Sequence, residues 1–348
     1  RYSVGEFLKG LAHRVGRSMK LFVGTSRGLF IVKDGKSHRA LDVRAVREIV
    51  QVQGDLLVGT SEGLYLSPDR GETWEGPFLG DYAVWQIRGD SHGTLYAGTN
   101  PAELFKSADG GRSWRSIESF KEIVEREGWC IPLNPPIPSQ ARAIVIDSEN
   151  DQQIWVGVEV GGILHTQNGG ESWVVGCPGE NPDLHMIFPH PREKGTLFAS
   201  TGYGRLDGIA EMAEGNAGVF RSSDSGESWE YVWGGISPRY SRPMCIDQSP
   251  PFAITVGSAP TAFSSYKDQG GAGAMLFRSE DDGATWRSLC DPRHTPSHAN
   301  FHGLAANPDD PGSVFVGTDN GELWFVGSDC QWSLLVDDLP TVLSIMPS

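Results

Sequence analysis

The stretch Ser67-Pro68-Asp69-Arg70-Gly71-Glu72-Thr73-Trp74 decides how this chain folds. Its pattern, Ser/Thr-x-Asp/Asn-x-Gly-x-x-Trp, returns at residues 107–114, 166–173, 222–229 and 279–286, and a shortened copy ends at Trp332. An Asp or Asn side chain can accept hydrogen bonds from backbone N–H groups across a turn, and the hydroxyl supports the same bend. Glycine permits a positive φ, and tryptophan places a large apolar ring in the adjacent core. We therefore expect each copy, called the turn motif below, to close a β-hairpin.

Short apolar segments separated by tight turns precede every turn motif. In the first complete unit, the four expected strands are residues 48–52, 56–60, 64–67 and 74–77. The first strands of later units are expected at residues 84–88, 142–146, 185–188, 242–246 and 302–306. Four-stranded units that recur every ~40–60 residues are typical of a β-propeller.

The two ends of the chain supply one more unit. Residues 21–25, 28–33 and 37–42 lack a first strand, whereas residues 341–346 form a lone strand. Joining them removes two exposed strand edges. We predict an all-β, seven-bladed β-propeller in which residues 19–348 form a single domain and the N-terminal strands and the C-terminal strand share the last blade. The alternative is six blades and an additional hairpin. Residues 1–18 are basic, lack the apolar core of a secretion signal, and are expected to be a leader or added segment outside the fold.

Composition restricts the partners. The formal charge of −15 over 348 residues argues against nucleic acid, which requires a basic face. No segment has the ~20 apolar residues of a membrane-spanning helix, so we expect no membrane partner. The five cysteines are an odd number without close spacing, which favours reduced thiols and a cytoplasmic protein.

The long insertions indicate where function lies. Residues 118–140, 202–217, 259–274 and 288–301 all fall in connections that a four-stranded meander places opposite the turn motifs. Loops on a rigid scaffold carry binding and catalytic residues, so we expect the site on this elaborated face.

The turn motif resembles the Asp-box, or bacterial neuraminidase repeat. This repeat is found in sialidases, sortilin-type receptors, some xyloglucan-degrading hydrolases and seven-bladed photosystem II assembly factors. The chain looks most similar to the sialidase-like bacterial propeller proteins of that group. The resemblance covers residues 19–348 and implies a propeller whose Asp boxes lie away from the active face. It says little about activity, because the same fold hosts unrelated functions.

One position of the first strands carries charged and aromatic side chains throughout. Aligning these strands brings together Arg47, Trp85, Arg142, His185, Arg242, His302 and Leu343. We expect them to gather at the channel mouth, where buried cations require anionic partners. The predicted ligand-binding residues, which would bind a carboxylate, sulfate or phosphate, are Arg47, Trp85, Arg142 and Arg242, with Tyr203 and Arg205 from an insertion. The alternative is that the arginines are structural ties to carbonyl groups and acidic residues.

Proton-transfer and metal chemistry are the further hypotheses. Glu159 and Asp319 follow second strands and are candidate acid/base groups with His185 and His302, or else counter-charges for the arginines. The spacing of His294, His298 and His302 suggests a Zn or Cu site in which His185, His298 and His302 are the ligands. Pro292 and Pro296, however, break any regular helix there. No other cofactor is expected.

The leading functional hypothesis is a propeller that binds an anionic small molecule or glycan, with hydrolysis of a glycosidase type as the expected chemistry if it is an enzyme. Resemblance to sialidases would imply an arginine triad and a tyrosine nucleophile. The Phe/Tyr-Arg-Ile-Pro sequence of sialidases is absent, however, and Ser241-Arg242-Pro243 only partly matches it. A typical sialidase is therefore not expected. The alternatives are a non-catalytic scaffold that binds a protein partner through the arginine-bearing face, and a histidine-ligated metalloenzyme.

Overall fold

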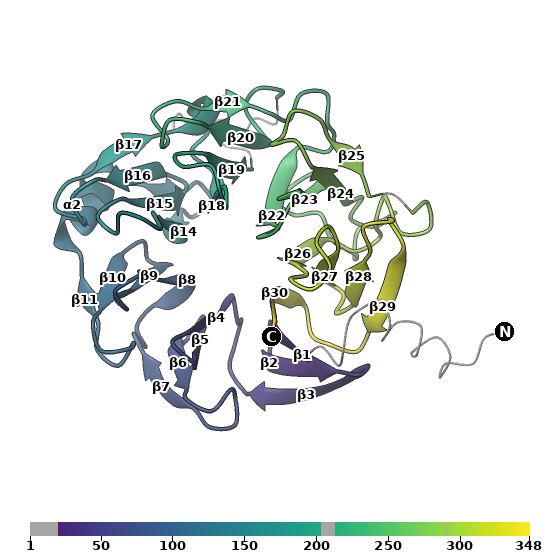
Figure 1. Cartoon of the computed structure of the whole chain (residues 1–348), viewed down its shortest axis with the longest axis horizontal. Helices are drawn as coiled ribbons and strands as arrows, with labels where there is room; N and C mark the ends of the chain where they lie inside the picture. The colour runs from purple at the N-terminus through teal and green to yellow at the C-terminus, as the bar shows by residue number, and fades with distance from the viewer. Residues whose placement is uncertain (1–19, 203–212, 290) are drawn as a thin grey trace. The chain divides into compact units, whose positions relative to one another are not determined.

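The computed structural model describes residues 20–202, 213–289 and 291–348, and these residues form seven four-stranded sheets (Figure 1). Every strand pairing given for these sheets is antiparallel, and the fold is the predicted all-β, seven-bladed propeller. The chain divides into two compact units, which are described separately. The middle unit is residues 47–242, and the terminal unit is residues 1–46 together with 243–348.

The middle unit contains four sheets, and in each of them strands that follow one another in the sequence are neighbours. Antiparallel strands can be joined by short turns, which favours this meander order. The sheets are β4–β7 (Glu48–Val52, Asp55–Thr60, Gly63–Ser67, Glu75–Phe78), β8–β11 (Ala83–Gly89, Leu95–Asn100, Leu104–Ser107, Arg115–Ser116), β14–β17 (Gln140–Ile146, Ile154–Glu159, Gly162–Thr166, Val174–Gly176) and β18–β21 (Leu184–Pro189, Leu197–Thr201, Val219–Ser222, Glu230–Tyr231). A short hairpin, β12 (Cys130–Ile131) and β13 (Ile137–Pro138), and a 3-10 turn, η1 (Pro178–Glu180), lie in its connections.

The terminal unit contains the sheets β26–β29 (Phe301–Ala306, Val314–Thr318, Leu323–Val326, Trp332–Val336) and β3-β2-β1-β30 (Lys36–Leu41, Gly28–Lys33, Lys20–Thr25, Val342–Pro347). The remaining sheet is β22–β25 (Tyr240–Ile246, Ile254–Ala259, Met275–Ser279, Arg287–Ser288), whose first strand crosses the boundary between the units. In Figure 1 the purple β1 lies beside the yellow β30, and Phe22 pairs with Met346. The seventh sheet therefore joins both ends of the chain, as predicted.

The turn motif is a hydrogen-bonded loop. Asp109 accepts bonds from the backbone N–H groups of Ser113 (2.9 Å) and Arg112 (3.1 Å) and from the Ser113 hydroxyl (2.6 Å). These donors, Ser113 first, hold the pKa of the Asp109 carboxyl well below its usual range. Gly111 adopts φ +91° and donates its N–H to Ser107 Oγ at 2.9 Å. Trp114 packs on a core cluster that includes Leu57 of the preceding sheet, so the motif joins neighbouring blades within this unit.

Glycines near the ends of second strands allow the sheets to approach closely. A Cβ at Gly98 of β9 would lie 2.5 Å from the carbonyl oxygen of Ala141 in β14, and one at Gly59 of β5 would lie 2.9 Å from that of Val84 in β8. Real Cβ atoms do not make such contacts, so a larger residue would push the sheets apart. The repeated Gly-Thr strand endings of the sequence are therefore a packing requirement.

Helix α2 (Glu118–Glu127) is the main element that the sequence did not predict. Phe120 and Ile123 are buried, and the helix ends at Gly128, which is left-handed with φ 62°. The Phe120 ring packs edge-on against Trp173, with centroids 5.4 Å apart, and Trp173 Nε1 donates to Ser119 Oγ at 3.1 Å. Because Trp173 belongs to a turn motif, this insertion begins against that motif rather than on the opposite face, where we expected the whole insertion.

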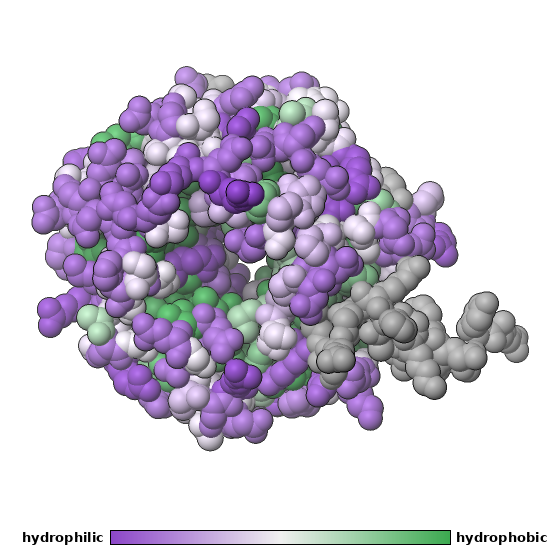
Figure 2. All heavy atoms as spheres, in the orientation of Figure 1, coloured by the Kyte–Doolittle hydropathy of each residue, from purple (hydrophilic) through white to green (hydrophobic). Residues whose placement is uncertain are grey.

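Hydrophilic residues dominate the molecular face seen in Figure 2, in keeping with the charged composition. Within the described residues, no helix is long and apolar enough to cross a membrane. The four described cysteines, Cys130, Cys177, Cys245 and Cys330, are not in disulfides.

Candidate functional site

In several first strands, the position aligned from the sequence is the extra residue of a β-bulge. In β8 the pairing jumps from Val84 to Gln86, in β14 from Ala141 to Ala143, and in β18 from Leu184 to Met186. The unpaired residues are Trp85, Arg142 and His185. The terminal unit has the same irregularity at His302 in β26 and at Leu343 in β30. A bulge redirects the side chain of its extra residue, and bulges are over-represented next to active sites.

Two bulge residues and Arg47, which immediately precedes β4, form a stack in the middle unit. The Cζ atom of Arg47 lies 3.9 Å from the Trp85 ring centre, and that of Arg142 lies 4.8 Å from it. Both distances are within the range of cation–π attraction. Burial, followed by the charges of Arg142 and Arg242, lowers the pKa of Arg47 to about 10. The guanidinium of Arg47 remains charged at neutral pH. A nearby anion would reduce the free-energy cost of burying this charge.

Two buried donors in this stack lack acceptors. Among the described residues, neither Arg47 Nε nor Trp85 Nε1 makes a hydrogen bond, although both atoms are removed from solvent. Buried donors in folded proteins are nearly always satisfied, so an unsatisfied pair in one stack indicates a missing acceptor. We call Arg47, Trp85, Arg142 and Arg242 the basic cluster.

Glu159, at the end of β15, is the carboxylate that contacts the basic cluster. Its Oε2 atom is ion-paired with Arg142 Nη1 and accepts a 2.8 Å bond from Gln140 Nε2. Burial raises its pKa, but the charge of Arg142 and the hydrogen bonds from Arg142 and Gln140 outweigh that effect, so the pKa is lowered. Glu159 is therefore ionised at neutral pH. Glu159 is ion-paired with Arg142, whereas Arg47 makes no ion pair in the described part of the chain.

His185 is completely buried beside Asp183 and Tyr240. Its Nδ1 atom donates to the Ser241 carbonyl at 2.8 Å, and its ring lies 4.8 Å from that of Tyr240. Nε2 is 3.2 Å from Asp183 Oδ1, but at an angle that makes no hydrogen bond. Burial and the Asp183 charge raise the pKa of the Tyr240 phenol. Tyr240 is therefore un-ionised at neutral pH and poorly suited to act as a nucleophile. Arg242 lies near the same ring, at 5.9 Å.

The other predicted site residues are placed differently. Asp319 of the terminal unit accepts hydrogen bonds from Ser265 Oγ (3.0 Å), Tyr266 N (3.0 Å) and Asn300 N (2.8 Å), so it fixes two loops. His298 and His302 belong to no cluster of potential metal ligands among the described residues, whereas His185 lies in one with Glu159 and Asp183. His294 instead stacks on Trp332, with ring centres 5.5 Å apart. Tyr203 and Arg205 lie outside the described residues.

Sequence reasoning missed Gln140 and Asp183. Each lies two residues before the aligned position of its strand, as do Tyr240 and Asn300. The side chains of alternate strand residues share a face, so polar residues at this second position were the available signal.

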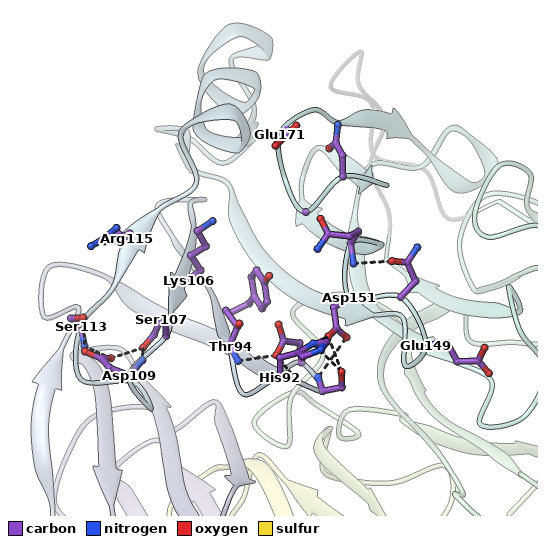
Figure 3. Close-up of a pocket in the computed structure, with 18 residues that line it drawn as sticks. His92, Thr94, Lys106, Ser107, Asp109, Ser113, Arg115, Glu149, Asp151 and Glu171 are labelled. Carbon is purple, nitrogen blue, oxygen red and sulfur yellow. Dashed lines mark hydrogen bonds and ion pairs between the residues drawn. The ribbon is translucent and has the colours of Figure 1, made fainter.

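A separate open cleft of about 870 Å³ lies between the sheets β8–β11 and β14–β17 of the middle unit. Figure 3 shows Lys106 and Arg115 on one wall and Glu171 and Asp151 on the other. His92 contacts Asp151 directly and is 82% exposed at its side chain. None of the predicted site residues lines this cleft.

Comparison with known proteins identifies similar propellers. No family model matches the chain. A probable oligoxyloglucan-reducing end-specific xyloglucanase of Neosartorya fischeri is 22% identical over 308 residues, covering 77% of this chain and 36% of the relative. The oligoxyloglucan-reducing end-specific xyloglucanase of Emericella nidulans is 27% identical over 216 residues, covering 58% of this chain and 25% of that protein. The chain thus spans about a third or less of the curated relatives that it matches.

Solved structures show the same fold at low identity. The GH74 enzyme of Niastella koreensis superposes with a TM-score of 0.62 at 14% identity, over 91% of this chain and 47% of that enzyme. YCF48 bound to a D1 peptide superposes with a TM-score of 0.54 at 16% identity, over 92% of this chain and 84% of the YCF48 chain. The chain is therefore a seven-bladed propeller that resembles GH74 xyloglucanases and YCF48. At these identities the structural likeness establishes the fold alone.

Proposed function

We propose that the protein binds the carboxylate of an acidic glycan or other small organic anion at the basic cluster. One observation carries the proposal: Arg47 Nε and Trp85 Nε1 are buried donors without acceptors, beside the guanidinium of Arg142. Guanidinium and indole N–H groups in one stack suit a carboxylate, which offers several lone pairs to donors.

The test compares D-glucuronate with D-glucose by isothermal titration calorimetry on the full chain. Glucuronate should bind and glucose should not, because only the former carries a carboxylate. A hydrogen bond to a charged group contributes about 1.5–3 kcal/mol, so Arg47→Gln should weaken glucuronate binding about 10- to 100-fold. The matched control is Arg126→Gln, since Arg126 is an exposed arginine of α2 that pairs with Glu127. Equal binding of the two sugars, or of wild type and Arg47→Gln, would refute the proposal.

Glycan hydrolysis at this site is the second candidate. The xyloglucanases among the relatives support a glycoside-hydrolase-like enzyme. Glu159 and Asp183 place carboxylate oxygens within 4.8 Å of each other, closer to the ~5–5.5 Å of retaining glycosidases than to the wider separation of inverting ones. Release of p-nitrophenol from p-nitrophenyl β-D-glucuronide, lost in Glu159→Gln and retained in Glu127→Gln, is the expected result. Absence of release by the wild type would exclude hydrolysis of this substrate and leave the binding proposal intact.

If small organic anions do not bind, we expect the ligand to be a protein partner. YCF48 has been solved with a D1 peptide, and the carboxylate of a peptide's C-terminus would meet the same donors. A peptide with a free C-terminus that binds more tightly than its amidated form, and loses this difference in Arg47→Gln, would identify a peptide as the ligand class.

A further inference from the structure

Three potential metal ligands converge in the middle unit, one from the end of β15 and two from the start of β18. Glu159 ends β15, Asp183 immediately precedes β18, and His185 is the bulge residue of β18. One carboxylate oxygen each from Glu159 and Asp183 and one ring nitrogen of His185 all lie within 4.8 Å of one another. The side chains of all three are at most 12% exposed, so the convergence is part of the interior rather than a surface acidic patch.

The hydrogen bonding of His185 leaves one nitrogen directed at this point. Because the Ser241 carbonyl can only accept, Nδ1 carries the hydrogen of their 2.8 Å bond. In the neutral ring Nε2 then has a lone pair, and it is buried without a hydrogen bond, 3.2 Å from Asp183 Oδ1. Asp183 Oδ1 lies to one side of that lone pair, as a second ligand of one cation would, rather than in line with it as a hydrogen-bond partner would. Metal-binding histidines typically donate their other N–H in this way.

Glu159 also retains an oxygen for a ligand. Arg142 and Gln140 both donate to Oε2, and in the described chain no group donates to Oε1. Gly202 packs tightly against the other two residues, since a Cβ at that position would overlap Asp183 and His185. Two of the three groups, His185 Nε2 and Glu159 Oε1, therefore make no hydrogen bond in the described chain, and Asp183 is the third group of the cluster.

We infer that Glu159, Asp183 and His185 form a binding site for a divalent cation, with Zn²⁺ as the best match. One imidazole nitrogen and two carboxylate oxygens are ligands that zinc accepts, and a fourth position is left for water or substrate. Ligands ~2.0–2.1 Å from zinc at a tetrahedral angle lie about 3.4 Å apart, and the Nε2–Oδ1 distance of 3.2 Å is close to that value. The positive charge of Arg142 opposes cation binding, so we expect a micromolar rather than a tighter Kd.

Zinc uptake is tested on the full chain after removal of metal with EDTA and of the EDTA by dialysis, in buffer without organic anions. Titration with ZnCl2 should show one equivalent bound and a raised Tm. His185→Gln should lower the affinity at least 100-fold and Asp183→Asn at least tenfold. The matched control is His92→Gln, because Asp90, His92 and Asp151 form the other cluster of this kind in the described residues, with His92 exposed. The His92→Gln variant should still bind one equivalent of zinc.

Each outcome decides the inference. The site is overturned if the wild type binds no zinc. It is also overturned if His92→Gln loses zinc binding while His185→Gln keeps it. If His185→Gln does not fold, folded Asp183→Asn decides: weakened zinc binding supports the site, and unchanged binding overturns it. The site does not depend on the anion proposal, which is judged by glucuronate binding without metal.

Discussion

Replacing Trp85 separates the two contributions of its ring to the basic cluster. Trp85→Phe keeps an aromatic face for Arg47 and Arg142 but removes the buried Nε1–H. If that donor binds the carboxylate, its loss costs about 1.5–3 kcal/mol, or about 10- to 100-fold in the Kd for glucuronate. Trp85→Leu also removes the cation–π attraction, which contributes about 0.5–2 kcal/mol per contact. We therefore expect affinity to fall from wild type to Trp85→Phe and further to Trp85→Leu.

The assay is calorimetric titration with glucuronate, and Tm is measured for each variant to show that it folds. Trp324→Phe is the control, because Trp324 Nε1 bonds Glu322 at 3.0 Å in the terminal unit, outside the basic cluster. The reasoning is refuted if both Trp85 variants fold and bind glucuronate as tightly as wild type. It is also refuted if Trp324→Phe weakens binding as much as Trp85→Phe, since the loss would then be unrelated to the cluster.

Three further predictions concern stability and are measured by urea unfolding. Phe120→Ala should lower the free energy of unfolding by about 3–5 kcal/mol, because the ring is fully buried under α2; a loss under 1 kcal/mol would show that the helix is not part of the core. Gly98→Ala should cost about 1–3 kcal/mol through overlap with Ala141, and a neutral effect would contradict the close sheet packing. Burial raises the pKa of Asp247 from 3.8 to about 6. The folded state therefore binds the proton more tightly than the unfolded state, and stability should fall as pH rises from about 4 to 6. Asp247→Asn should make the free energy of unfolding less dependent on pH in this range. An unchanged pH dependence would show that other groups cause it.

The strands could be read from the sequence because their signals are local. The turn motif fixes each hairpin through contacts within eight residues, as the bonds of Asp109 show, and the Gly-Thr endings mark strands that approach a neighbour. Helix α2 carried a signal as well, since Phe120, Ile123 and Val124 have helical spacing. We missed it because we read the whole insertion as a loop.

The site was only partly predictable. Alignment of the first strands identified Arg47, Trp85, Arg142 and His185, which the structure brings together in the middle unit. It could not reveal that the aligned position is a bulge, because a bulge is defined by the register with a partner strand. Asp183 was missed because we compared only the aligned position and not the residue two positions before it. The regular histidine spacing at 294, 298 and 302 suggested a cluster that the described backbone does not form.

The pairing of β1 with β30 has a consequence for the newly made polypeptide. Lys20–Thr25 is synthesised ~300 residues before its partner Val342–Pro347, which takes about 15–60 s at a synthesis rate of ~5–20 residues per second. During that interval the apolar edge of β1 has no native neighbour and is open to aggregation. Chaperones that shield exposed strand edges should therefore matter most before β30 is translated, and removal of β30 should lower soluble yield more than its length alone implies.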